Sequence, residues 1–205
     1  AAFNWDTIYG ELDWLPGGGL NTAHECIDRH ANGPNASKTA MIWAGKNGEE
    51  ETYTFADLKR LTNQFANLLR NLGVQRGDRV FMFMERVPEQ YIAVFGTLKA
   101  GAIAGPLFSA FGPDPVRDRL QDSGAKLLVT TSELRKRIAH IMPDLPDLEN
   151  VLIVNKLGRD DTPIAEGDLQ YDNLMADASD DFDIESTSMY DYSIMHYTSG
   201  TTGKP

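Results

Sequence analysis

The sequence has 205 residues, of which 41% are hydrophobic and 24% charged, and these values are typical of a globular chain of about one domain. Its 30 acidic and 19 basic residues give a net charge of −11, which excludes broad binding to nucleic acid. One cysteine, Cys26, excludes an intramolecular disulfide and favours a reducing, cytoplasmic location. We expect Cys26 to be buried, and no apolar run approaches the roughly 20 residues of a membrane span.

The first segment, residues 1–35, is predicted to be an irregular N-terminal arm. Its glycine run, Gly17–Gly19, comes before a short predicted helix in which Ala23, Ile27 and His30 fall on one face. No predicted strand precedes the glycines, so a linker is favoured over a phosphate-binding turn.

The most regular helical pattern follows a predicted strand at residues 39–45. Thr54 and Asp57 have the spacing of a capping box, which favours a helix start. Gly73 follows the last apolar residue, as expected at a helix end. Apolar residues recur between them at spacings of three and four: Phe55, Leu58, Leu61, Phe65, Leu69 and Leu72.

Apolar strands and amphipathic helices then alternate. The predicted strands are residues 78–84, 102–108, 125–131 and 150–155. The predicted helices are residues 88–101, 114–124 and 132–141, the last capped by Ser132. This alternation predicts the α/β class, with a largely parallel sheet and helices on both faces, within residues 36–205.

The pattern weakens after residue 156. Residues 171–178 favour a helix, and residues 179–188 are polar and acidic. Asp177, Asp181 and Asp183 suggest calcium, but an EF-hand loop needs a glycine at its sixth position and none is present, so a solvated loop is favoured. Residues 191–197 predict a short apolar strand that leads into the last loop.

Most common catalytic patterns are absent from the sequence. The fourth residue after His24 is Asp28 rather than histidine, so the zinc-protease spacing fails. No G-x-S-x-G elbow is present, and no G-x-G-x-x-G follows a strand.

The final loop, "YTSGTTGKP" at residues 197–205, has the composition of a phosphate-binding turn. Small residues after a strand can direct backbone N–H groups at phosphate oxygens, and hydroxyls add further donors. A Walker A motif is excluded because only two residues separate Gly200 from Gly203, and Pro205 stands in place of the magnesium-binding hydroxyl. A phosphotransferase of the P-loop type is therefore disfavoured, and a plain surface turn is the alternative.

The same loop resembles the phosphate-loop signature of the AMP-forming acyl-CoA synthetases, in the adenylate-forming superfamily. The stretches "YTFADLKRLTNQFANLLRNLGVQRGDRV" and "LKAGAIAGPLF" resemble two further family motifs in the expected order. "GGGLNTAHECIDRH" resembles the N-terminal arm of acetyl-CoA synthetases. "GDRVFMFM…PE" and "GPLFSAF…DRLQDSGAKLLVTT" narrow the resemblance to a bacterial type of acetyl-CoA synthetase.

The resemblance implies a reaction, its substrates and site residues. Acetate or another short-chain carboxylate would react with ATP and Mg²⁺ to give an acyl-adenylate, and coenzyme A would then take the acyl group. Arg135, with Arg137 as a helper, would meet the 3′-phosphate of coenzyme A, and Phe108 to Phe111 would lie near its adenine. The ATP phosphates would contact Thr198, Ser199, Gly200, Thr201, Thr202, Gly203 and, as the weakest match, Lys204.

The resemblance also implies what this chain lacks. The family's magnesium glutamate, ribose aspartate and catalytic lysine follow the phosphate loop. We therefore expect no catalytic residue, metal ligand or C-terminal domain here, an inactive N-terminal fragment, and self-association through an exposed strand edge. The alternatives are a longer-chain acyl-CoA ligase fragment and a non-catalytic module that binds coenzyme A or a partner.

Overall fold

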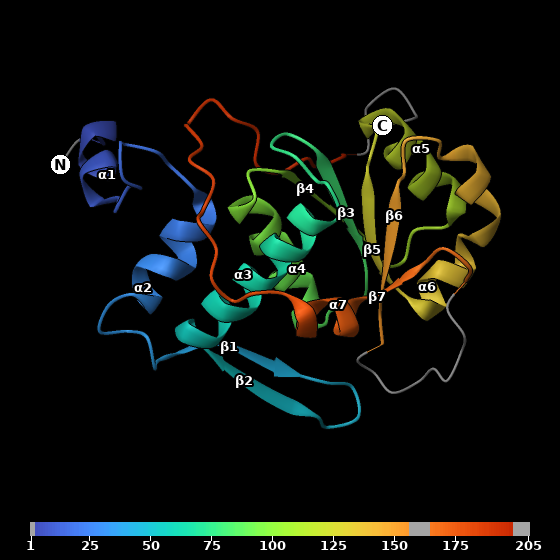
Figure 1. The fold of residues 1–205 in the computed structure, drawn as a ribbon, viewed down its shortest axis with the longest axis horizontal. Helices are drawn as coiled ribbons and strands as arrows, with labels where there is room; N and C mark the ends of the chain where they lie inside the picture. Colours follow the sequence, from blue (N-terminus) through green and yellow to red (C-terminus); the bar gives the residue numbers. More distant parts are fainter. Residues whose placement is uncertain (1–2, 156–164, 199–205) are drawn as a thin grey trace.

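The fold is a parallel β-sheet between two layers of helices, with a small hairpin and an N-terminal arm at one side (Figure 1). The structure is a computed structural model, and it describes residues 3–155 and 165–198. The predicted α/β class is confirmed. The predicted boundary at residue 35, between the N-terminal arm and the α/β portion, stays a prediction. The arm packs on the rest of the chain.

Five parallel strands form the main sheet in the order β4-β3-β5-β6-β7. Gly105 pairs with Phe81 across the sheet, and a Cβ at Gly105 would lie 2.5 Å from the Phe81 ring, so glycine permits this close approach. The strands are β3 (Arg79–Phe83), β4 (Ile103–Leu107), β5 (Leu127–Thr131), β6 (Asn150–Val154) and β7 (Leu169–Gln170).

Alternate residues of each central strand face the two helical layers. Val80 and Met82 pack with α3 (Phe55–Asn71), α4 (Pro88–Lys99) and α7 (Tyr171–Asp177). Phe81 and Phe83 pack with α5 (Pro113–Ser123), α6 (Ser132–Arg137) and the 3₁₀-helix η2 (Ala139–Asp144). Both faces are buried, as a covered parallel sheet requires.

The boundaries of α3 and α5 follow the predicted signals, and α3 ends at Asn71, two residues before Gly73. Thr54 and Asp57 form the full capping box: the Thr54 hydroxyl accepts from the Asp57 N–H at 3.1 Å, and the Asp57 carboxylate accepts from the Thr54 N–H at 3.0 Å. Gly124 ends α5 in the left-handed region at φ 58°.

The N-terminal third contains more structure than the sequence predicts. It holds α1 (Trp5–Glu11), the π-helix η1 (His24–Asp28) and α2 (Arg29–Ala31), so the arm is only partly irregular. The strand β1 (Thr39–Ala44) pairs antiparallel with β2 (Glu50–Thr54) and does not join the main sheet. The strand β2 was not predicted, because its polar residues run directly into the capping box of α3.

Two side chains are placed differently from the prediction. Cys26 is exposed, because Ala23 and Ile27 occupy the buried side of this turn. Ser132 is not the cap of α6: Thr131 holds that position, and the Ser132 hydroxyl donates to Oδ1 of Asn155 at 2.7 Å.

The predicted strand at residues 191–197 reduces to one bridge. Ala104 of β4 pairs in parallel with Ile194; its N–H donates to Ser193 O, and its carbonyl accepts from Met195 N–H, both at 2.9 Å. Pro106, two residues further along the same side of β4, has no N–H, so a ladder cannot continue there.

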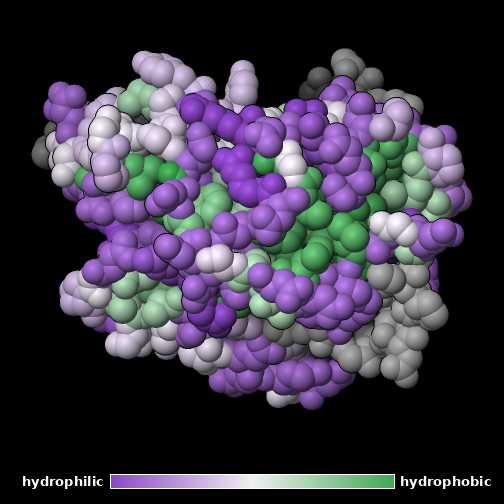
Figure 2. All heavy atoms as spheres, viewed as in Figure 1, coloured by the Kyte–Doolittle hydropathy of each residue, from purple (hydrophilic) through white to green (hydrophobic). Residues whose placement is uncertain are grey.

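The surface in the same view is mainly hydrophilic, with a hydrophobic area near the centre, over the region of α4 and β3 (Figure 2). That the chain associates with itself through such a face stays a prediction.

Candidate functional site

The carboxyl ends of the parallel strands meet at one edge of the sheet. Because Ile194 pairs in parallel with Ala104, the segment that ends at Thr198 arrives at the same edge as the loop that follows β4. Ligands of open α/β sheets bind at this edge. Thr198 is exposed there, and the other predicted phosphate-loop residues, Ser199 to Lys204, lie outside the described residues.

Tyr197 anchors the entrance of this loop. Its hydroxyl donates to Oδ2 of Asp122 at 2.7 Å, and the guanidinium of Arg119 lies 5.5 Å from the centre of its ring. Burial, with the hydrogen bond to Asp122, raises the pKa of Tyr197 to about 12, so the hydroxyl stays a donor at neutral pH. No local motif predicts this contact, since Tyr197 and Asp122 are 75 positions apart.

The loop after β4 brings together three of the residues predicted for coenzyme A. The Phe108 and Phe111 rings meet edge to face at 5.8 Å, and Phe108 is 62% exposed. The Arg137 guanidinium donates to the Ser109 carbonyl at 2.7 Å, which fixes this loop to the end of α6. An exposed aromatic ring can stack on a base, and a guanidinium that contacts the same loop can bind a phosphate.

Arg119 connects this aromatic pair to the terminal segment. Its guanidinium lies 4.6 Å from the centre of the Phe111 ring, and it also lies over Tyr197, so one cation contacts both rings. The predicted coenzyme A segment and the entrance to the predicted phosphate loop therefore share one supporting residue on α5.

Arg135 lies apart from this cluster. Its Nε lies 2.9 Å from Oδ2 of Asp168, and the two side chains are only 14% and 5% exposed. Two residues along a helix point to different sides, so Arg135 faces Asp168 while Arg137 faces the loop after β4. A phosphate at Arg135 would have to compete with Asp168, and the role predicted for Arg135 stays a prediction.

Polar side chains join the ends of the central strands. The Thr131 hydroxyl donates to Glu85 at 3.0 Å, where the loops after β3 and β5 meet. Asn155 accepts from Ser132 and donates to Gln170 at 3.3 Å. Glu85 and Asn155 were not predicted, although each follows a buried strand within two residues, which is a usable signal.

Within residues 3–155 and 165–198, no group of three or more His, Cys, Asp or Glu side chains could hold a metal ion. Asp177, Asp181 and Asp183 accordingly form no cation site. The same described ranges contain no helix with the length and apolar composition needed to cross a membrane.

Comparison with known proteins identifies the family. The family model for AMP-binding enzymes matches residues 27–205. The chain belongs to this AMP-binding enzyme family. The matched residues include Phe108 and Phe111, Arg135 and the terminal loop.

The relatives within the AMP-binding family carry a consistent name. The acetyl-coenzyme A synthetase of Bacillus subtilis is 42% identical over 212 residues, which cover 98% of this chain and 36% of the relative. The acetyl-coenzyme A synthetase of Gemmatimonas aurantiaca is 38% identical over 207 residues, covering 94% and 32%. The resemblance to acetyl-CoA synthetases is confirmed, and this chain spans about a third of the length of these relatives.

Solved structures agree on the fold. The Brucella canis acyl-CoA synthetase matches with a TM-score of 0.86 and 29% identity, over 98% of this chain and 35% of that one. The anthranilate CoA ligase AuaEII in complex with anthranoyl-AMP matches with a TM-score of 0.80 and 26% identity, over 93% and 34%. These matches confirm that the sheet is part of the fold of adenylate-forming enzymes.

Proposed function

We propose that this chain is part of an ATP-dependent acetyl-CoA synthetase and supplies its phosphate loop and a surface for coenzyme A. In the first half-reaction, acetate oxygen attacks the α-phosphorus of ATP, giving acetyl-adenylate and pyrophosphate. In the second, the thiol of coenzyme A attacks the acetyl carbonyl and releases AMP. The names of the relatives support this reaction, and a cytoplasmic location fits the single cysteine.

The single observation that carries the proposal is the parallel bridge between Ala104 and Ile194. It directs Thr198 to the edge that also holds Phe108, so ATP phosphates and coenzyme A would approach from the same side of the sheet. Donors on this loop would offset the charge that accumulates when a carboxylate approaches a triphosphate.

The described residues have separate roles in this proposal. Phe108 presents a ring face to the adenine of coenzyme A, and Arg137 holds the loop that carries it and offers charge to a phosphate. Arg135 contacts a phosphate only after it leaves Asp168.

The reaction also uses Mg²⁺, which would neutralise part of the phosphate charge. The described carboxylates at this edge do not fit such a site, because Glu85 is bonded to Thr131 and belongs to no group of three or more His, Cys, Asp or Glu side chains. We also expect the 205-residue chain alone to be inactive, because adenylation needs the phosphate donors, the metal site and the catalytic lysine positioned together.

Calorimetric titration of the chain with coenzyme A tests the surface. Phe108→Ala should weaken binding about tenfold, because base–aromatic stacking contributes about 1–3 kcal/mol. Phe3→Ala, which removes a phenylalanine that is 70% exposed, should leave binding unchanged. Equal effects of the two variants would contradict the assignment of Phe108.

The reaction can be tested by expressing the complete reading frame that contains this chain and measuring pyrophosphate release. Pyrophosphate release with ATP and Mg²⁺ should depend on acetate. Release with long-chain acids alone would favour the longer-chain ligase. No release with any acid, combined with binding of coenzyme A, would favour a non-catalytic module.

A further inference from the structure

The acidic segment between α7 and the bridge at Ile194 has mostly exposed side chains, as predicted for a solvated loop, but hydrogen bonds hold its backbone in place as a strap. We define the strap as residues 178–193. It leaves α7, crosses α3 and passes beside the N-terminal arm before it reaches β4 (Figure 1). Its course is fixed by hydrogen bonds to its backbone, which come mainly from α3 and the N-terminal arm; Arg76 also donates to the Ser186 carbonyl, and the Glu185 N–H donates to the Lys99 carbonyl.

Side-chain amides of α3 hold the first half of the strap. Asn67 Nδ2 donates to the carbonyls of Ser179 and Asp181, each at 2.8 Å. Asn63 Nδ2 donates to the Asp180 carbonyl at 2.8 Å. These bonds fix the strap on the helix, where Ala178 and Phe182 also pack with the core.

The N-terminal arm holds the second half. Asn21 Nδ2 donates to the carbonyls of Leu98, at 2.7 Å, and Glu185, at 3.2 Å, while its Oδ1 accepts from the Ala23 N–H at 3.0 Å. Asn21 is 2% exposed, so these bonds are shielded from water. The Leu20 N–H also donates to the Thr187 carbonyl at 2.7 Å, and the Thr187 hydroxyl donates to the Leu20 carbonyl.

A buried ion pair fixes the arm in turn. Lys99 Nζ lies 2.8 Å from Oδ2 of Asp28 and donates to Oδ1 of Asn63 at 2.6 Å. The Lys99 and Asp28 side chains are 0% and 3% exposed. The arm therefore cannot shift relative to α4 unless a buried charge loses its partner, which is costly.

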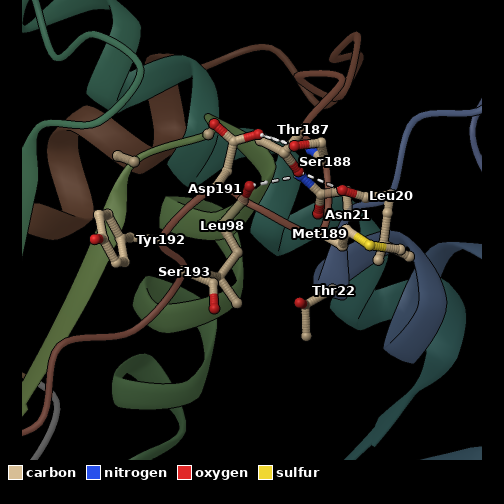
Figure 3. A pocket seen from close by; sticks show the side chains of 12 residues that line it. Leu20, Asn21, Thr22, Leu98, Thr187, Ser188, Met189, Asp191, Tyr192 and Ser193 are labelled. Atoms are coloured by element: carbon tan, nitrogen blue, oxygen red, sulfur yellow. Dashed lines mark hydrogen bonds between the residues drawn. The ribbon is translucent and has the colours of Figure 1, made fainter.

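Beyond Thr187 the strap separates from the arm. A cavity of about 230 Å³ lies between them, and its lining includes Asn21, Thr22, Met189 and Ser193 (Figure 3). The strap returns to the sheet where the Ala104 N–H donates to Ser193 O. Between the Asn21 contacts and the bridge at Ala104, Arg76 donates to the Asp191 carboxylate at 2.8 Å, so the strap is held at three points before Thr198.

We propose that the N-terminal arm, through Asn21, positions the phosphate loop. Asn21 is a positioning residue: it fixes the strap that leads, through the bridge at Ala104, to Thr198. This inference rests on the proposed function, because the loop's ligand is taken to be the phosphates of ATP.

The first test measures steady-state kinetics of the fully expressed reading frame. Asn21→Ala should raise the KM for ATP about tenfold and leave the KM for coenzyme A within about twofold. Asn67→Ala is the matched control, because it removes the same group from the first half of the strap, and both KM values should stay unchanged. Thr187→Val, which deletes one hydroxyl at nearly constant shape, should raise only the KM for ATP if Asn21→Ala does not fold.

A result that overturns the inference is an equal rise of both KM values in Asn21→Ala, or an equal rise of the KM for ATP in Asn21→Ala and Asn67→Ala. Either would show a general structural role. If the unsubstituted enzyme releases no pyrophosphate with any carboxylic acid, the proposed function itself would be refuted.

Hydrogen exchange on the 205-residue chain separates these failures. Asn21→Ala should speed exchange of the Ala104 and Met195 amides, which form the bridge. Asn67→Ala should leave both amides as protected as in the unsubstituted chain. Unchanged protection of Met195 in Asn21→Ala would overturn the inference whatever the enzyme does.

Discussion

The sheet and the strap are ordered by different forces. In β3, Val80 to Phe83 are all 0% exposed, so burial of apolar side chains holds the sheet. In the strap, most side chains reach solvent, and amide-to-carbonyl hydrogen bonds from α3 and the arm hold the backbone. A chain segment can therefore be well fixed without an apolar pattern of its own, because its partners supply the donors.

The largest expected effect is in the sheet. Phe81→Ala should lower the free energy of unfolding by about 3–5 kcal/mol, because it removes a fully buried ring and leaves a cavity against Gly105. Urea denaturation measures this loss. Phe108→Ala is the control at the end of the neighbouring strand, and it should change stability by less than about 0.5 kcal/mol. Similar losses in the two variants would remove the contrast between buried and exposed phenylalanine.

The ion pair under the arm should give the next effect. Lys99→Met leaves Asp28 buried without its partner, and breaking such a pair costs about 3 kcal/mol or more. The double variant Lys99→Met with Asp28→Asn should recover part of this loss, because no uncompensated charge remains. A double variant as unstable as the sum of the single ones would show that the two residues act independently.

The same lysine predicts a pH dependence. Burial lowers the pKa of Lys99 from 10.5 to about 8, against the opposing influence of Asp28. Between these values the unfolded chain keeps the proton that the folded chain has lost, so the contribution of Lys99 to the unfolding free energy rises with pH from about 8 to 10.5. The total is on the order of 3 kcal/mol at most. Lys99→Met should abolish this rise in denaturation curves across that window; a rise that persists would contradict the assignment.

The smallest effect is expected where the strap meets solvent. The hydrogen bond from Arg76, with those from Ser188, lowers the pKa of Asp191 from 3.8 to about 2. The stabilisation is therefore present above pH 3.8 and is lost as pH falls toward 2. Asp191→Asn should make thermal unfolding less sensitive to acid in that window. If the acid sensitivity is the same in the variant, the pair with Arg76 contributes nothing measurable.

The contrast also decides what the sequence could predict. Strands of the sheet follow from runs such as Leu127–Val129, and α3 follows from its capping box and apolar spacing, because burial leaves a periodic signal in the residues that are buried. The strap leaves no such signal, since its partners Asn21 and Asn67 lie more than 100 positions earlier. Its acidic residues therefore suggest a solvated loop.

The candidate site divides in the same way. Phe108 and Thr198 are proposed as site residues from motifs that are local in the sequence, and the topology brings their segments to one edge. The pairing of Arg135 with Asp168 spans 33 positions and no motif contains both residues. Side-chain partners of this kind depend on the folded geometry.

Because Pro106 interrupts backbone pairing, side-chain contacts set the direction of the terminal segment. A continuous ladder would fix the direction of that segment through the backbone alone, whatever side chains it carried. With one bridge at Ala104 and no N–H at Pro106, the direction after Met195 depends on the contact of Tyr197 with Asp122 and Arg119. A substitution at Tyr197 should therefore change the direction of the described segment that ends at Thr198, while the sheet itself stays unchanged.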